Sequence, residues 1–288
     1  MQANVGASSI KFTAINEDFF YSSYLNGKEE VPLLKAYIKY MRVGIMQPYF
    51  FPYLGYWQLV NAVDKFVILD DVNYIMRGYI NRNSILVNGK PHKFSLSIDK
   101  PSQNKLINET QLLFPVKERR KLLKTIEMAY HKAICFSDVF PIIENAIMYS
   151  NNDLVDFIKN SITLTVEYLG IDTEILVSSE IIKDESKKSQ DRIIEINMQL
   201  GSDTYINPIG GQSLYNRDDF KQLGIDLYFI EMQTYEYKQF NNDFVPNLSF
   251  IDIMMFNTKE TIAEMLESYK LIDGGSTPAS FNTMGEKI

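Results

Sequence analysis

The chain has 288 residues, a formal net charge of −7, 45% hydrophobic residues and a single cysteine. The hydrophobic share is sufficient for a large core. The negative charge argues against a protein whose main partner is nucleic acid, because phosphate binding needs an excess of Lys and Arg. One cysteine excludes an intrachain disulfide and indicates a reducing compartment. With no apolar stretch near the roughly 20 residues that span a bilayer, and no signal pattern, we expect a cytoplasmic protein.

Composition divides the chain into three regions. Residues 1–41 are predicted to be an N-terminal extension, and residues 42–272 a single α/β domain. Residues 273–288 are small and polar, so we expect a mobile tail there.

The first half of the domain begins with a β-α-β pattern. Residues 42–47 and 65–70 predict strands, and residues 55–63 between them predict a helix. Residues 84–97 predict an antiparallel hairpin, because Asn88-Gly89 fits a type I′ turn.

Helices and strands alternate through the rest of the domain. The clearest helix is 153–169, where apolar residues recur every three or four positions and Gly170 provides a stop. The other predicted helices are 115–131, 140–149, 189–200, 217–223, 248–256 and 259–268, and the other strands are 173–177, 203–207 and 225–231. Such alternation implies parallel pairing with right-handed crossovers. We therefore predict a three-layer, Rossmann-like α/β fold with a mainly parallel sheet, an antiparallel hairpin insertion and C-terminal helices.

Two carboxylates stand at the end of the predicted strand 65–70. In open α/β sheets, ligands bind outside the carboxyl ends of the strands. Asp70 and Asp71 could serve as metal ligands, as a general base, or as acceptors for sugar hydroxyls, or one of them could simply cap a turn. Neighbouring residues of a strand point to opposite faces, so we expect only one of the two to face a ligand.

Further candidates for substrate binding cluster after the strands. Arg82 is suited to a bidentate grip on a diphosphate, although it could equally pair with Asp70 or Asp71. Aromatic rings near the first strand end could stack on a base or sugar, and small residues in two later loops favour a phosphate or carboxylate. The full set is Gln47, Tyr49, Tyr53, Tyr56, Asn81, Arg82, Asn83, Ser178, Ser179, Gly210, Gly211 and Tyr215.

The remaining reactive residue types give weaker signals. His131 is a candidate proton carrier, but His92 and His131 have no Cys or carboxylate at ligand spacing, so we predict no metal site. The sequence identifies no cofactor. Cys135 stands among apolar residues, which is typical of an inert buried thiol. Two basic clusters are more typical of solvated helix faces than of anion sites; they are Lys117, Arg119, Arg120, Lys121 and Lys124, and Lys187, Lys188 and Arg192.

Several of these segments together resemble a known family. The pattern is Gln47-Pro48-x-x-x-Pro52-x-x-Gly55-Tyr56, then Val67-Ile68-Leu69-Asp70-Asp71-Val72, then Asn81-Arg82-Asn83-Ser84-Ile85, with Phe244-Val245-Pro246-Asn247-Leu248-Ser249-Phe250-Ile251-Asp252 near the end. In this order the motifs resemble the WbqC-like protein family, and the similarity runs from about residue 41 to about residue 272.

The resemblance implies a role in surface-polysaccharide biosynthesis, such as that of the O-antigen of lipopolysaccharide. It implies a transferase that moves an acyl or aminoacyl group, such as glycyl, to the amine of a nucleotide-linked amino sugar. The donor would be an aminoacyl adenylate, a carrier thioester or an aminoacyl-tRNA. The alternative is a non-catalytic sugar-nucleotide binder or scaffold in the same pathway.

A fainter similarity is to nucleotidyltransferases that begin with a His-x-Gly-His motif. Gly55-Tyr56 stands where those enzymes have Gly-His, and residues 41–91 contain no histidine. Because those histidines stabilise the charge that builds on the transferring phosphate, their absence argues against nucleotidyl transfer.

Overall fold

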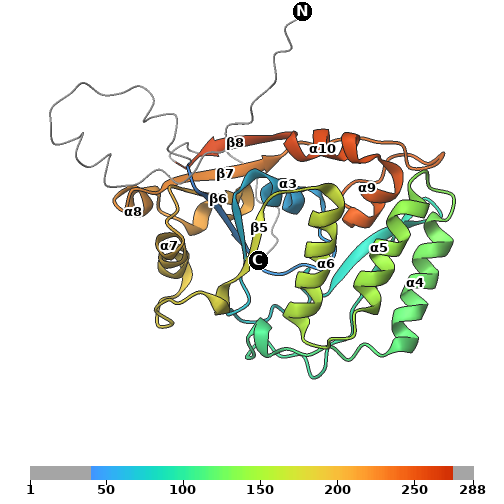
Figure 1. The fold of residues 1–288 in the computed structure, drawn as a ribbon, viewed down its shortest axis with the longest axis horizontal. Helices are drawn as coiled ribbons and strands as arrows, with labels where there is room; N and C mark the ends of the chain where they lie inside the picture. The colour runs from blue at the N-terminus through green and yellow to red at the C-terminus, as the bar shows by residue number, and fades with distance from the viewer. Residues whose placement is uncertain (1–39, 275–288) are drawn as a thin grey trace, which may run out of the picture. The chain divides into compact units, whose positions relative to one another are not determined.

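A six-stranded sheet forms the centre of the protein in a computed structural model, which describes residues 40–274 (Figure 1). The strands are β5 (Glu174–Val177), β2 (Lys65–Ile68), β1 (Arg42–Met46), β6 (Thr204–Pro208), β7 (Asp226–Met232) and β8 (Tyr269–Asp273), in spatial order. Neighbours from β5 to β7 pair in parallel, and β8 alone is antiparallel. The predicted mainly parallel sheet is confirmed.

Helices cover both faces of this sheet, as a parallel sheet requires. Alternate residues of a strand enter different cores: Phe66 packs in the core that contains α3 (Leu54–Ala62). Val67 packs in the other core, with α7 (Ser189–Gln199) and α8 (Arg217–Lys221). The predicted three-layer arrangement follows from this alternation.

The predicted β-α-β unit at the start of the domain is also confirmed. Strand β1 leads through α3 to β2, and Met46 is the register partner of Ile68. Gly44 lets α3 approach β1 closely, since a Cβ atom there would lie 3.2 Å from Leu59 Cδ1.

A group of helices extends the core beyond the sheet: α4 (Val116–Tyr130), α5 (Phe136–Met148), α6 (Leu154–Leu169), α9 (Phe250–Phe256) and α10 (Lys259–Glu267). Asp153 caps α6 by accepting a hydrogen bond from Asp156 N, and Gly170 ends it with φ of 69°. Arg119 corrects the prediction of a fully solvated basic face on α4, because its side chain is buried and donates to the carbonyl oxygens of Phe114 and Ile147.

The hairpin of β3 (Arg82–Val87) and β4 (Lys90–Ser95) forms a separate two-stranded sheet. Asn88 and Gly89 have φ of 50° and 72°, as the predicted type I′ turn requires. The predicted antiparallel insertion is confirmed.

Strand β8 is not predicted by the sequence. It extends to Asp273, the first residue of the predicted tail, and Gly274 N donates to Leu227 O. As an edge strand with exposed Lys270 and Leu271, it lacks the alternation of a half-buried strand, and it depends on the free edge of β7. The predicted N-terminal extension up to residue 39 and the tail from residue 275 lie outside the described residues.

A buried carboxylate joins the helices to the hairpin. Asp252 in α9 is inaccessible to solvent and accepts hydrogen bonds from Tyr130 Oη at 2.6 Å, Tyr237 Oη at 2.7 Å and Gln239 Nε2 at 2.7 Å. Tyr130 Oη in turn accepts from Leu86 N in β3. Burial raises the pKa of Asp252, and the three donors offset part of this rise.

We expect Asp252→Ala to lower the free energy of unfolding by roughly 3–5 kcal/mol, because it leaves two buried donors and the half-buried Tyr237 hydroxyl without an acceptor. Tyr237→Phe removes one donor, so about 1–2 kcal/mol is expected. Urea unfolding of both variants measures these losses. Glu264→Ala, on the exposed side of α10, is the control and should stay within about 0.5 kcal/mol. If Asp252→Ala is as stable as the unaltered protein, the hydrogen bonds to the Asp252 carboxylate do not stabilise the fold.

Candidate functional site

The carboxyl ends of three strands lie level at one edge of the sheet. Met46, Ile68 and Val177 are register partners across β1, β2 and β5. The next residues of the chain therefore leave the sheet together, and they include Gln47 and Ser178 among the predicted site residues.

Asp70 is held in place by Ser179. Its carboxylate is only 1% exposed and accepts hydrogen bonds from Ser179 N at 2.9 Å and Ser179 Oγ at 2.6 Å. Ser179 lies in the short 3₁₀ turn Ser178–Glu180 that follows β5, and it is exposed. Burial raises the pKa of Asp70, and the Ser179 hydrogen bonds lower it in part. The pair connects a buried carboxylate to a hydroxyl at the surface.

Asp71 lies in a different environment from its neighbour. Its carboxylate pairs with Lys183 Nζ at 2.9 Å and with Arg192 Nη1 at 3.6 Å. The Lys183 side chain is 3% exposed and also donates to Ser178 O. Arg192 Nη1 also donates to the backbone oxygen of Asp71, and its Nε donates to Lys187 O. These two cations hold residues 178–192 against the end of β2.

Lys183 and Arg192 contact Asp71, although the sequence analysis predicted neither as a site residue. Arg192 was predicted to lie on a solvated helix face, which is wrong, because its side chain is 14% exposed and faces Asp71. Both lie more than 100 residues from Asp71 along the chain, as the 121-residue separation of the Arg192 contact shows. No local pattern signals such a pair.

A group of tyrosines surrounds the backbone beyond β1. Tyr56 Oη donates to Gln47 O at 3.2 Å, and the Tyr49 ring centroid lies 5.6 Å from that of Tyr56 and 6.2 Å from that of Tyr79. Burial raises the pKa of Tyr49 to about 12, and the neighbouring Tyr53 and Tyr79 add to this effect. Gln47, Tyr49, Tyr53 and Tyr56 are thus brought together, with the exposed Tyr79 as an unpredicted member.

Arg82 adjoins this tyrosine group. Its Nε donates to Gly78 O at 2.7 Å, next to Tyr79. Within residues 40–274 it has no carboxylate partner, so the alternative pairing with Asp70 or Asp71 does not occur there. Its two terminal nitrogens have no hydrogen-bond partner in that range.

The asparagines on either side of Arg82 hold the chain in place. Asn81 accepts from Tyr74 Oη at 2.9 Å and donates to Leu96 O, and Asn83 donates to Phe51 O at 2.6 Å. Both side chains bind other parts of the fold. Their predicted contact with substrate remains a prediction.

The second predicted loop packs tightly after β6. Gly210 and Gly211 belong to the 3₁₀ helix Ile209–Leu214. A Cβ on Gly211 would collide with Asn207 Nδ2, at 2.1 Å, and Tyr215 Oη lies 3.3 Å from Tyr205 Oη. Packing therefore explains Gly211, whereas a Cβ on Gly210 would meet no atom within 4 Å. No described contact joins this loop to Asp70 or Gln47.

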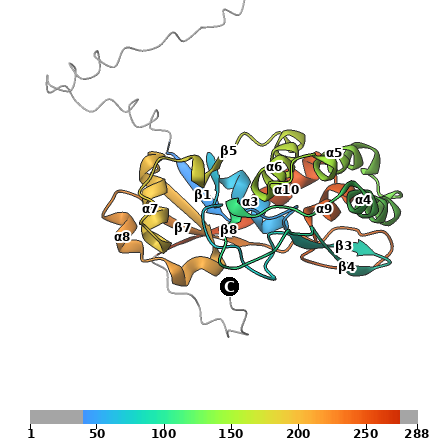
Figure 2. The same cartoon turned by 90° about the horizontal axis from the view of Figure 1, so that it is seen from below.

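His131 is the C-cap residue of α4 and is exposed, with Nδ1 3.3 Å from Met128 O. Helices α4 and α7 lie at opposite ends of the domain in both views (Figures 1 and 2). No contact in the described part of the chain joins His131 to Asp70 or Asp71. Its role as proton carrier remains a prediction.

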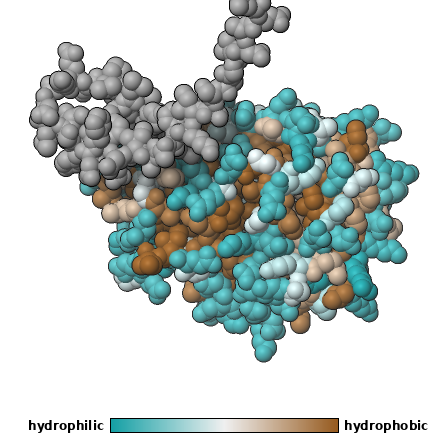
Figure 3. Space-filling model, in the orientation of Figure 1, coloured by the Kyte–Doolittle hydropathy of each residue, from teal (hydrophilic) through white to brown (hydrophobic). Residues whose placement is uncertain are grey.

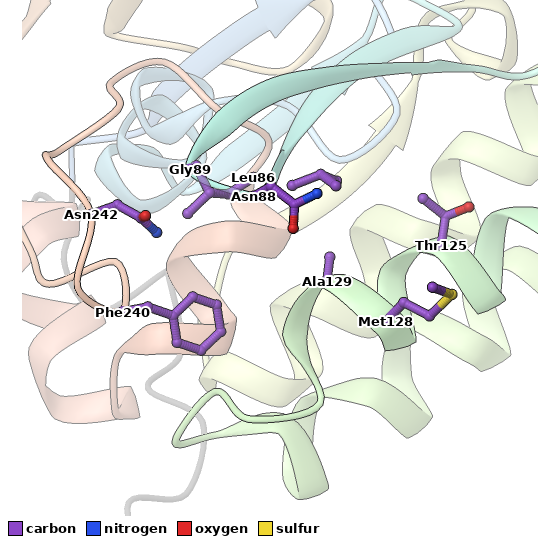
Figure 4. Close-up of a pocket in the computed structure, with 9 residues that line it drawn as sticks. Leu86, Asn88, Gly89, Thr125, Met128, Ala129, Phe240 and Asn242 are labelled. Atoms are coloured by element: carbon purple, nitrogen blue, oxygen red, sulfur yellow. The ribbon is translucent and has the colours of Figure 1, made fainter.

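A cavity of about 340 Å³ lies elsewhere, between the hairpin turn and α4 (Figure 4). Its walls include Leu86, Asn88, Met128 and Phe240, and none of the predicted site residues line it. It was missed because its walls come from three separate segments, each of which has an ordinary packing pattern.

Two broader searches cover residues 40–274. No group of three or more His, Cys, Asp or Glu side chains there is arranged to hold a metal ion. No helix among them is both long and apolar enough to cross a membrane. On the face shown in Figure 3, apolar residues are interspersed with hydrophilic ones.

The raised pKa of Asp70 predicts a pH effect on stability. Above the ordinary Asp pKa of about 3.9, the Asp70 carboxyl group has lost its proton in the unfolded chain but still holds it in the folded chain. The free energy of unfolding should therefore fall as the pH rises from about 4 through the folded-state pKa. Urea unfolding from pH 3.5 to 7 should show this fall, and Asp70→Asn should lack the part that Asp70 contributes while keeping the part from Asp252, whose pKa is also raised.

Ser179→Ala provides the matched variant. Loss of the hydroxyl donor raises the pKa of Asp70 further, so the fall in stability should extend to higher pH. If the free energy of unfolding depends on pH in the same way in Asp70→Asn and in the unaltered protein, Asp70 is not the group that titrates with a raised pKa.

Comparison with known proteins identifies the family. A model of the WbqC-like protein family matches residues 47–264. The uncharacterized protein Rv1507c of Mycobacterium tuberculosis (strain ATCC 25618 / H37Rv) is 23% identical over 216 residues, which are 74% of this chain and 92% of that protein. No solved structure matches. The family match spans most of the domain, from the end of β1 to α10, and the chain belongs to the WbqC-like protein family.

Proposed function

We propose that this protein is a cytoplasmic transferase of surface-polysaccharide biosynthesis, such as O-antigen assembly. It moves an acyl or aminoacyl group, such as glycyl, from an adenylate, a carrier thioester or an aminoacyl-tRNA to the amine of a nucleotide-linked amino sugar. The observation that carries the proposal is the Asp70–Ser179 pair at the carboxyl edge of the sheet. Family membership supports the pathway through the resemblance described above.

The reaction needs a proton acceptor. The amine nitrogen forms a bond to the acyl carbon, the bond from that carbon to the donor's leaving group breaks, and the amine proton must leave. Ser179 is an exposed residue and its Oγ lies 2.6 Å from Asp70, so the proton passes through this hydroxyl to the buried carboxylate. A base with a raised pKa suits this task, because a general base works best when its pKa is near the working pH.

The tyrosine group and Arg82 supply the binding side. The two terminal nitrogens of Arg82, unpartnered within residues 40–274, suit a bidentate grip on the diphosphate of a nucleotide sugar. Tyr49 and the exposed Tyr79 offer rings for a base or a sugar, while Tyr56 is buried and packs against Tyr49. Asp71 has a different role, since its pairing with Lys183 and Arg192 orders the segment that carries Ser179.

The direct test incubates the protein with dTDP-linked amino sugars and each donor class, followed by mass spectrometry of the products. We expect a mass gain of one acyl group.

Asp70→Asn should lower kcat by about 100-fold or more with KM within a few-fold, as loss of a general base does. Arg82→Gln should raise KM by about 10-fold or more, because it removes a charge-assisted hydrogen bond. Arg120→Gln, at an exposed position of α4, is the control for lost charge. No mass gain with any donor counts against the transferase.

A second candidate is a non-catalytic sugar-nucleotide binder or scaffold. The observation that favours it is the near-complete burial of Asp70, which leaves Ser179 as the exposed member of the pair. In that case Arg82→Gln weakens the binding of dTDP-sugar in calorimetry, Asp70→Asn leaves it unchanged, and no variant has turnover to lose.

A further inference from the structure

The cavity beside the hairpin has walls from three separate elements. Asn88 and Gly89 come from the turn between β3 and β4, and Met128 comes from α4. Phe240 comes from the segment before α9 (Figure 4). Its volume of about 340 Å³ is at the lower end of the range for small-molecule sites.

The Asp252 network holds these walls in position. Tyr130, which follows the α4 wall, donates to Asp252 and accepts from Leu86 N in the hairpin wall. Gln239, next to Phe240, donates to the same carboxylate and accepts from Val245 N. One buried carboxylate thus fixes all three walls, so the cavity is formed before any ligand binds.

A glycine lies where two of the walls meet. A Cβ on Gly89 would lie 2.7 Å from Asn242 Oδ1, so the Asn242 side chain would have to shift to admit one. Asn242 Nδ2 is already bound to Gln239 O at 3.1 Å. The amide of Asn242 is therefore part of the wall.

The lining selects an uncharged and mainly apolar ligand. Leu86, Val87, Met128, Ala129 and Phe240 supply most of the surface, and no charged side chain lines the cavity. An ion would lose its hydration there without a partner of opposite charge. Met128 is 68% exposed at the rim, and methionine adapts its shape to ligands.

Asn88 supplies a polar side chain to the lining. The Asn88 side chain extends from the turn toward α4 and has no hydrogen-bond partner in the described part of the chain (Figure 4). Its amide offers both a donor and an acceptor, which matches a carbonyl or carboxamide group.

We propose that this cavity is a second binding site, separate from the Asp70–Ser179 pair, for a small uncharged molecule with an apolar body and a carbonyl or carboxamide group. The apolar body fills the space between Phe240 and Ala129, and its polar group binds the Asn88 amide. This inference does not depend on the proposed transferase activity.

The test uses benzamide as the probe, with benzoate and toluene as matched probes of the same ring size. The methyl groups of Met128 and Ala129 are followed by NMR in the full chain. We expect saturable shifts with benzamide and roughly tenfold or greater weakening with benzoate, since the cavity offers no cation. Toluene, which cannot use Asn88, should bind about three- to tenfold more weakly than benzamide.

Two variants locate the binding site. Asn88→Gly keeps the positive φ of the turn and should weaken benzamide about three- to tenfold, the size of one neutral hydrogen bond. Ala129→Leu fills the cavity and should abolish the shift at Met128. Asn241→Gly, exposed and outside the lining, is the control and should leave binding unchanged.

No saturable shift with benzamide, equal affinity for benzoate, or unchanged binding in Asn88→Gly would each overturn the proposal. If Ala129→Leu fails to fold, the comparison of Asn88→Gly with Asn241→Gly still decides it.

Discussion

The parallel register of β1, β2 and β5 determines which residues of this protein can act together. Parallel strands that end level must send their following residues to the same edge of the sheet. Asp70 follows β2 and Ser179 follows β5, and their hydrogen bonds join segments 109 residues apart in the chain. The buried core on each face fixes this register, since a shift of one residue would move Phe66 and Val67 to the wrong cores.

Two carboxylates at the end of one strand have opposite surroundings. Asp70 is deeply buried, which raises its pKa, and the hydrogen bonds from Ser179 lower that pKa in part. Asp71 lies between two cations that also bind backbone carbonyl groups. Strand β2 ends at Ile68, and the two carboxylates that follow it bind different partners: Asp70 binds Ser179, and Asp71 binds Lys183 and Arg192.

Local chemistry in the sequence predicted most of the fold. Asn88-Gly89 and Gly170 have the positive φ that turn and C-cap geometry require, and both were predicted because few other residues adopt it. Strand β8 was missed because Lys270 and Leu271 are both exposed in it, so its sequence shows no alternation of apolar and polar residues. The candidate site was harder to predict. The sequence indicated that Asp70 and Ser179 follow strands, but the Lys183 and Arg192 contacts with Asp71 depend on tertiary packing.

The single thiol of this chain lies between two helices. Cys135 is the N-cap of α5; its Sγ donates to Asn257 O, and its backbone N donates to Met255 O at 3.1 Å. An alkylating reagent can reach this sulfur only when α5 and α9 part. Because the chain contains no other cysteine, the rate of labelling under native conditions reports the free energy of that local opening at one position, without any engineered label.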